Sequence, residues 1–208
     1  MQNGLRGSAD LAARHELDGL PPTTAVTVGL ATHRQLHDLI TLARREIPGI
    51  HVTEAGLARF LQCDPESISA FERSGKLLGG IAFLYLNSRG HDALLLDAVD
   101  LKNPRSELLA RGNEEVSAIY VWALACHGRA VLGLGNVARY LKKPRFFAAD
   151  YFAHPATRAG RDLLIAIGFK PISSSKPDLW CYRRPWNRVP QNIPAANFSG
   201  RSFADARH

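Results

Sequence analysis

Residues 118–169 decide the fold, and they read AIYVWALACHGRAVLGLGNVARYLKKPRFFAADYFAHPATRAGRDLLIAIGF. The apolar run at 118–122 predicts a buried strand, the Gly-containing sequence 126–129 predicts a turn, and the apolar spacing over 131–141 predicts a helix. A strand that enters a helix through a short turn leaves backbone N–H groups unpaired at the helix start. Together with the helix dipole, these groups favour a phosphate there.

The second half of this stretch repeats the strand-helix order. Residues 146–151 predict a second strand, and a second helix is expected to end at Ile167-Gly168-Phe169, where glycine is typical of a helix C-terminus.

The N-terminal half supplies further elements. Residues 25–30 predict a strand, and Thr32 is expected to cap a helix that ends at Pro48-Gly49. Thr53 is expected to cap a short helix that runs to Leu61. The inward-facing positions of the first helix are Leu36, Leu39, Ile40, Ala43 and Ile47.

The middle of the chain reads mainly as strands. Residues 68–72 fit a strand, although Asp64-Pro65 could equally start a helical turn there. Residues 77–86 give the strongest strand signal, and 93–99 predict one more strand. A polar insertion covers 102–113. The predicted fold is α/β, with a mixed, partly parallel central sheet flanked by helices.

Composition bounds the domain count. With 208 residues, 46% of them hydrophobic, the chain can form one full core, expected at 24–184. Residues 1–23 are expected to be a flexible leader, and the basic, Pro-containing segment 185–208 a tail. No apolar run is long enough to cross a membrane, and the N-terminus lacks the apolar core of a secretory signal. Three dispersed cysteines predict reduced thiols, a cytoplasmic protein and no metal site.

The charge is divided unevenly along the chain. Residues 1–128 carry 12 Lys and Arg against 15 Asp and Glu, a net −3, whereas residues 129–208 carry 14 against 4, a net +10. The basic half therefore begins at the predicted phosphate turn, which indicates an anionic ligand: a nucleotide cofactor, the phosphopantetheine arm of a carrier protein, or nucleic acid. A tail that only aids solubility is the alternative for residues 185–208.

The order of elements and two short motifs resemble the GNAT acyltransferase family. The turn His127-Gly128-Arg129-Ala130-Val131-Leu132 is similar to the family's Gln/Arg-x-x-Gly-x-Gly/Ala cofactor loop, and Gly168-Phe169 matches the end of its last helix. The turn departs from the pattern at Ala130 and Leu132, where the family has small residues. The resemblance implies that this turn binds the pyrophosphate of acetyl-CoA or another acyl-CoA.

The resemblance also implies how the rest of the donor is bound. Val121, Trp122 and Ala123 would pair with the pantetheine arm, and a backbone N–H near Val121 or Trp122 would stabilise the oxyanion. Longer acyl chains on CoA or on an acyl carrier protein stay open, with Leu132, Leu134 and Leu164 as candidates to line an acyl tunnel.

Catalysis of acyl transfer to an amine also requires proton transfer. Glu115 is favoured as the base over Glu114, Asp97 and Asp100, because it lies within the strand pattern. The family's tyrosine in the last helix is replaced by Leu164, so Tyr151 and His154 are the nearest substitutes as proton donors.

The sequence thus predicts a GNAT-like N-acyltransferase that moves an acetyl or longer acyl group from CoA to a primary amine of a small molecule, peptide or protein lysine. A homodimer is compatible with it. The alternatives are a carrier-protein donor, or a non-catalytic GNAT scaffold that binds an acidic partner or nucleic acid. Few aromatic residues accompany the basic tail, which disfavours base stacking.

Overall fold

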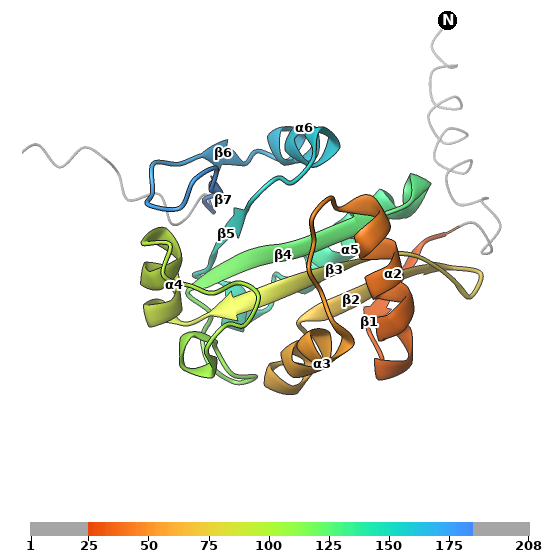
Figure 1. Ribbon diagram of the computed structural model, residues 1–208, viewed down its shortest axis with the longest axis horizontal. Coiled ribbons are helices and arrows are strands. Elements are labelled where there is room, and N and C mark those ends of the chain that lie inside the picture. The colour runs from red at the N-terminus through yellow and green to blue at the C-terminus, as the bar shows by residue number, and fades with distance from the viewer. Residues whose placement is uncertain (1–24, 185–208) are drawn as a thin grey trace, which may run out of the picture.

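The computed structural model describes residues 25–184 and contains a seven-stranded sheet in the order β1-β2-β3-β4-β5-β7-β6 (Figure 1). Every neighbouring pair is antiparallel except β4 and β5, which run parallel. The strands are β1 (Thr27–Leu30), β2 (Ile68–Arg73), β3 (Lys76–Leu86), β4 (Ala118–Cys126), β5 (Asp150–Ala153), β6 (Lys170–Pro171) and β7 (Trp180–Tyr182). The predicted mixed α/β fold is confirmed.

Side-chain caps begin several of the helices. The Thr53 hydroxyl accepts a hydrogen bond from the Gly56 N–H (3.1 Å), and the Thr157 hydroxyl accepts one from the Gly160 N–H (3.0 Å). The α-helices are α2 (Leu36–Glu46), α3 (Glu54–Cys63), α4 (Ser88–Leu95), α5 (Leu134–Tyr140) and α6 (Arg158–Ala166). Short 3₁₀ helices are η2 (His33–Gln35), η3 (Ser106–Leu108), η4 (Gly128–Gly133) and η5 (Pro144–Phe146). None of the helices within 25–184 is long and apolar enough to span a membrane.

Strand β3 lies at the centre of the core, and its last eight residues are all buried. Alternation along the strand divides the apolar side chains between two layers. Ala82, Leu84 and Leu86 pack with the face covered by α2, α3 and α4, whereas Phe83 and Tyr85 pack with residues of α5 and η5 on the other face (Figure 1).

The predicted strand at 93–99 is wrong, because α4 (Ser88–Leu95) occupies the first part of this segment. The Asn87 side chain caps that helix by accepting a hydrogen bond from the Gly90 N–H (2.9 Å), and Leu94 is fully buried. Gly90 also packs tightly on η3, since a Cβ atom at this position would lie 2.1 Å from the Leu108 carbonyl oxygen. The apolar residues of α4 therefore follow helical rather than strand geometry.

Other predicted boundaries shift. The strand expected at 146–151 begins only at Asp150, because Phe146 ends η5 and is fully buried. The helix expected over 131–141 is divided into η4 and α5. The alternative left open near Asp64-Pro65 is settled by β2, which begins at Ile68. The predicted leader and the predicted tail lie outside the described residues.

An ion-pair cluster joins the α3–β2 loop to η5. The Arg145 guanidinium lies 2.7 Å from the Asp64 carboxylate, and both side chains are largely buried. Lys143 lies 2.7 Å from Glu66, and Arg145 also lies within 3.5 Å of Glu66. Burial raises the pKa of Glu66, but the hydrogen bond and charge of Lys143 and the charge of Arg145 outweigh it and leave that pKa below its usual value.

We expect Asp64→Asn to lower the free energy of unfolding by about 3 kcal/mol, because it removes the nearer and more buried of the two carboxylates that face the buried Arg145 charge. Urea denaturation monitored by circular dichroism measures this change. Glu107→Gln is the matched control: its ion pair with Arg105 has both side chains more than half exposed, so the loss should stay below about 1 kcal/mol. Equal losses for the two variants would contradict a stabilising role for the cluster.

Candidate functional site

The parallel strands β4 and β5 separate halfway along β4. Their pairing runs from Ala118↔Asp150 to Val121↔Ala153 and then stops. β4 nevertheless continues to Cys126, and it remains paired with β3 as far as Gly79↔Cys126. Among the described residues, no strand pairs with the other edge of β4 over 122–126, so its backbone groups face an opening between the two strands.

A β-bulge lies at the start of this opening. In the register with β3, Phe83 faces Val121 and Ala82 faces Ala123, which leaves Trp122 as the extra residue. The Trp122 side chain is fixed on the α3 side of the sheet: its indole Nε1 donates to the Leu101 carbonyl oxygen at 2.7 Å. Its ring also packs edge-on against Phe60, with the ring centroids 5.2 Å apart. The bulge therefore holds the Trp122 backbone at the mouth of the opening.

The turn after β4 is built around Gly128. This residue has φ +55°, a conformation that glycine adopts without the steric cost of a Cβ atom. The His127 N–H donates to the Leu78 carbonyl oxygen at 2.8 Å, which ties the turn to β3. His127, Gly128 and Arg129 are exposed, whereas Ala130 is fully buried in the core. The exposed part of the turn is thus accessible to an external anion.

The remainder of the predicted cofactor turn faces different environments. Val131 is 37% exposed and Leu132 is 68% exposed, so the Leu132 side chain projects into solvent. Gly133 packs against β1 and β2, since a Cβ atom there would lie 2.9 Å from Val28 and 3.3 Å from Phe71. Glycine at this position lets η4 approach the sheet closely.

The opening is bordered on one side by α6. Val121 and Tyr151 pack against an apolar cluster that includes Leu164, Phe169 and Trp180. Leu164, which replaces the tyrosine expected from the family pattern, is a buried member of this cluster.

The three predicted catalytic residues lie at different distances from the opening. His154 is exposed and directly follows Ala153, the last residue of β5 paired with β4. Tyr151 lies three residues earlier, opposite Ile119. Glu115 is exposed and precedes the start of β4, seven residues before Trp122 or about 23 Å along an extended chain. The structure therefore brings His154 next to the opening and leaves Glu115 at the other end of β4.

Tyr151 is held by Arg184. The Arg184 guanidinium donates to the Tyr151 hydroxyl, donates also to the Leu141 carbonyl oxygen at 2.8 Å, and lies 4.8 Å from the Tyr151 ring centroid. Burial raises the pKa of Tyr151 more than the charge and hydrogen bond of Arg184 lower it, so the phenol keeps its proton at neutral pH. This arrangement gives Tyr151 a fixed position in the sheet.

Cys126, the last residue of β4, and Glu46 of α2 interact electrostatically. Burial, with a smaller contribution from the charge of Glu46, raises the pKa of the Cys126 thiol to about 12, which makes this thiol a poor nucleophile. Glu46, in the last turn of α2, is a residue that the sequence analysis did not single out. An acidic residue in the last turn of a helix opposes the helix dipole. This unfavourable position of Glu46 is the feature of the sequence that could have drawn attention to it.

A small apolar cavity adjoins the bulge on the α2 and α3 face. Its volume is about 30 Å³, and its walls include Leu39, Val52, Leu57, Trp122 and Ala123. Within residues 25–184, no group of three or more His, Cys, Asp or Glu side chains is placed to hold a metal ion.

A mixed sheet in which two central parallel strands separate at a bulge, followed by a Gly-containing turn into a helix, defines a GNAT fold. Comparison with solved structures agrees. Naa50 of Arabidopsis thaliana, solved with the bisubstrate analogue CoA-Ac-MVNAL, gives a TM-score of 0.52 at 11% identity, covering 77% of this chain and 100% of that one.

Two other solved structures are similar to this chain. The loading GNATL domain of CurA from Lyngbya majuscula has a TM-score of 0.50 and 16% identity, with 67% of this chain and 69% of that one covered. The GphF GNAT-like decarboxylase, solved with isobutyryl-CoA, has a TM-score of 0.50 and 16% identity, with 68% and 72% covered. No protein-family model and no curated protein matches the sequence. The chain has the GNAT fold, as its sequence motifs predicted.

We expect Gly128→Ala to lower both the free energy of unfolding, by about 1–2 kcal/mol, and the affinity for CoA, because alanine resists the positive φ of the turn. Gly135→Ala is the matched control. It lies in α5, where an added Cβ atom would have no other atom within 4 Å, and alanine should stabilise the helix by about 0.5–1 kcal/mol. Chemical denaturation and calorimetric titration with CoA measure both effects. Unchanged CoA affinity in Gly128→Ala would exclude the turn from the binding site.

Proposed function

We propose that this protein transfers a short acyl group from a CoA thioester to a primary amine. The observation that carries the proposal is the opening between β4 and β5, with Trp122 at its mouth and the Gly128 turn at its end. The amide groups of a pantetheine arm can pair with the free edge of β4 as an added strand would. The CoA derivatives bound to Naa50 and GphF support a donor of this class.

The turn suits the diphosphate end of the donor. In this proposal the backbone N–H groups after His127 and the Arg129 side chain bind the pyrophosphate, because these groups are exposed beside the positive φ of Gly128. Val121, Trp122 and Ala123 hold the pantetheine arm. The Ala130 N–H already donates to the His127 carbonyl oxygen at 3.2 Å, so Gly128 and Arg129 supply the N–H groups, while Val131 and Leu132 border the turn with exposed side chains.

The chemistry follows from this placement. The amine nitrogen attacks the thioester carbonyl carbon, and the resulting oxyanion is stabilised by a backbone N–H at Val121 or Trp122. The C–S bond then breaks and CoA leaves as a thiolate. Starting from the neutral amine, His154 accepts one amine proton through a water molecule and returns it to the thiolate sulfur, so no net proton is gained or lost. In this proposal Tyr151 positions β5, and Glu115, at the opposite end of β4, does not act as the base.

The acyl group is short in this proposal. The cavity at the bulge, about 30 Å³, has room for a group of acetyl size against Leu57 and Trp122. Leu132 is 68% exposed and Leu164 packs with Phe169 and Trp180, so the proposal assigns neither of these leucines to an acyl tunnel. The acceptor amine belongs to a small molecule, a peptide or a protein lysine.

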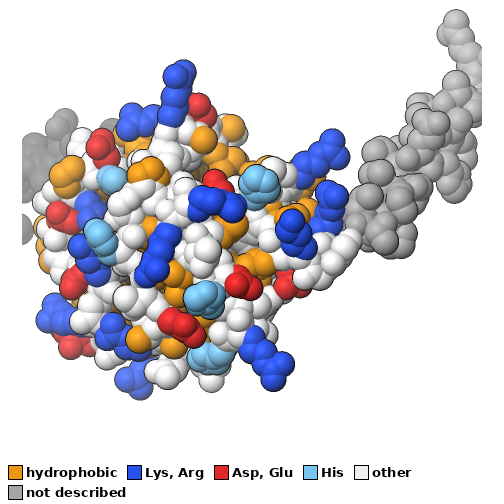
Figure 2. Space-filling view, turned by 45° about the vertical axis from the view of Figure 1, so that its right-hand side comes forward, with side chains coloured by type: hydrophobic (Ala, Val, Ile, Leu, Met, Phe, Trp, Pro, Cys, Tyr) orange, Lys and Arg blue, Asp and Glu red, His pale blue; other side chains and the backbone are white. Residues whose placement is uncertain are grey.

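The alternative function, a non-catalytic GNAT scaffold that binds nucleic acid or an acidic partner, has less support. On the face drawn in Figure 2, Lys and Arg side chains are interspersed with Asp and Glu rather than gathered into one basic surface. Strong nucleic-acid binding requires such a continuous surface to neutralise phosphates. The net charge of the C-terminal half is consistent with a small anionic ligand.

We expect acetyl-CoA to stabilise the protein. At 100 times its dissociation constant a ligand adds about 2.7 kcal/mol, which raises the melting temperature by a few degrees. Acetyl-CoA, octanoyl-CoA and free CoA are compared by thermal shift, and acetyl-CoA should give at least as large a shift as octanoyl-CoA. No shift with any of them at millimolar concentration would favour a carrier-protein donor or a binding scaffold.

We expect His154→Gln to lower kcat/KM for acyl transfer by about 10² or more, because glutamine cannot carry the amine proton to the thiolate. Glu115→Gln is the control and should leave kcat/KM within about twofold, because Glu115 lies at the opposite end of β4. The initial rates of both variants and of the unmodified chain are measured with acetyl-CoA and the same primary amine. A large loss in Glu115→Gln with none in His154→Gln would reverse the assignment.

A further inference from the structure

A second pocket lies between α3 and the α4–β4 connection, which we define as residues 96–117. It is open to solvent, has a volume of about 360 Å³, and lies within the size range of small-molecule sites. Its lining includes Arg59, Phe60, Gln62, Asn103, Pro104 and Arg105. Among the described residues, none of those that line it is acidic.

The rim of the pocket is cationic. One Arg59 amino group donates to the Asn103 side-chain oxygen at 2.7 Å, which positions the guanidinium over the pocket. Arg105 lies 3.2 Å from Glu107, but its side chain is 67% exposed. A guanidinium has five N–H donors in a planar fork, so both arginines retain donors for a carboxylate or a phosphate.

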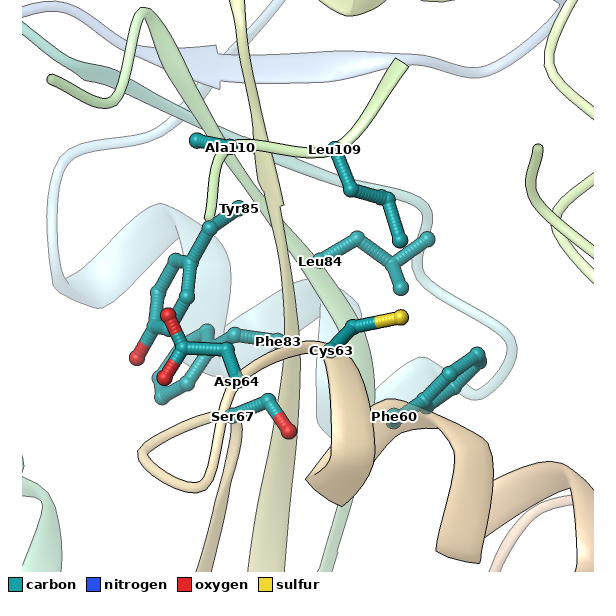
Figure 3. A pocket seen from close by; sticks show the side chains of 9 residues that line it. All are labelled: Phe60, Cys63, Asp64, Ser67, Phe83, Leu84, Tyr85, Leu109 and Ala110. Carbon is teal, nitrogen blue, oxygen red and sulfur yellow. The ribbon is translucent and has the colours of Figure 1, made fainter. Parts of the chain in front are cut away.

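The floor of the pocket is apolar, and a smaller cavity beneath this floor contains the buried hydroxyl of Ser67. Phe60, Cys63 and Leu109 line both this pocket and a water-sized cavity beneath it. In Figure 3 the Cys63 sulfur points toward the side where Phe60 and Leu109 lie, whereas the Asp64 carboxylate points the other way, toward Tyr85. Ser67 lines the inner cavity, is 3% exposed, and its hydroxyl has no hydrogen-bond partner among the described residues.

We propose that this pocket binds a small organic anion whose carboxylate or phosphate is held by Arg59 and Arg105 and whose apolar part lies on Phe60, Pro104 and Leu109. Arginine pairs suit both anions because the guanidinium fork matches their oxygen geometry. The planar ring of Phe60 and the apolar floor suit an aromatic or aliphatic body.

The pocket is distinct from the opening between β4 and β5, although one ring pair connects them. Phe60 lines the pocket and packs edge-on against Trp122, whose indole donates to Leu101 in the same connection that supplies Asn103 and Arg105. A ligand in the pocket therefore changes the environment of Trp122. The proposal does not depend on acyl transfer.

Phenyl phosphate is the first probe, with benzoate, inorganic phosphate and benzyl alcohol in parallel, and binding is measured by calorimetric titration. We expect saturable binding of phenyl phosphate or benzoate, and the stronger of the two identifies the preferred anion. Inorganic phosphate and benzyl alcohol should each bind at least about tenfold more weakly. Inorganic phosphate lacks the apolar ring, and benzyl alcohol lacks the anionic group. Equal affinity for benzyl alcohol would overturn the proposal, and so would no saturation with either anion up to about 10 mM.

The double variant Arg59→Gln, Arg105→Gln should weaken binding roughly tenfold or more. Arg45→Gln is the matched control, since Arg45 is an exposed arginine on α2 paired with Glu46 and outside the pocket.

Binding should also alter tryptophan fluorescence in the unmodified chain, and this change should be lost in Trp122→Phe. Unweakened binding in the double variant would contradict the assignment. The acetyl-CoA thermal shift should be unchanged in the double variant, which separates this test from that of the proposed function.

Discussion

The backbone of β4 governs the rest of the structure, because a central strand must satisfy hydrogen-bonding groups on both of its edges. Within residues 25–184, β4 is paired on both sides as far as Val121, and beyond that residue it pairs with β3 alone. The bulge at Trp122, the turn at Gly128 and the packing of α6 all lie around the place where the second partner is lost. A site for a ligand that can itself pair with a strand is the direct result.

The two ends of β4 differ in burial: one lies beside a buried ion pair, and the other leads into an exposed turn. Just before its start, the Val116 N–H donates to the Arg145 carbonyl oxygen, and the Arg145 side chain is bound to Asp64. Beyond its other end, His127 and Arg129 are exposed. Buried ion pairs and continuous sheet pairing belong to the most stable parts of a fold, whereas exposed turns open more readily. One end therefore fixes the sheet while the other is free to admit a ligand.

The sequence predicted most of the sheet and several of the helix starts, because these depend on local signals. Thr53 caps α3 as expected, and 77–86 forms the most buried strand. The segment of α4 resembles a strand in sequence because short apolar runs suit either element, and the Asn87 cap is the signal that distinguishes them. The position of the bulge could not be predicted from the sequence, because it depends on the register between Ala82 and Ala123 rather than on the side chain of Trp122. Glu115 is favoured only by its place in the sequence pattern, which cannot reveal at which end of a strand the sheet opens.

The separation of β4 from β5 also bears on how the protein avoids self-association. An unpaired strand edge is a template on which another chain can add, with aggregation as the outcome. Among the described residues, the edge of β4 without a strand partner is the five-residue stretch Trp122–Cys126, which lies inside the sheet rather than at its border. A neighbouring chain would have to enter between two strands that are already joined at the adjacent residue, Val121. The position of this edge inside the sheet therefore limits access to a partner that fits between β4 and β5.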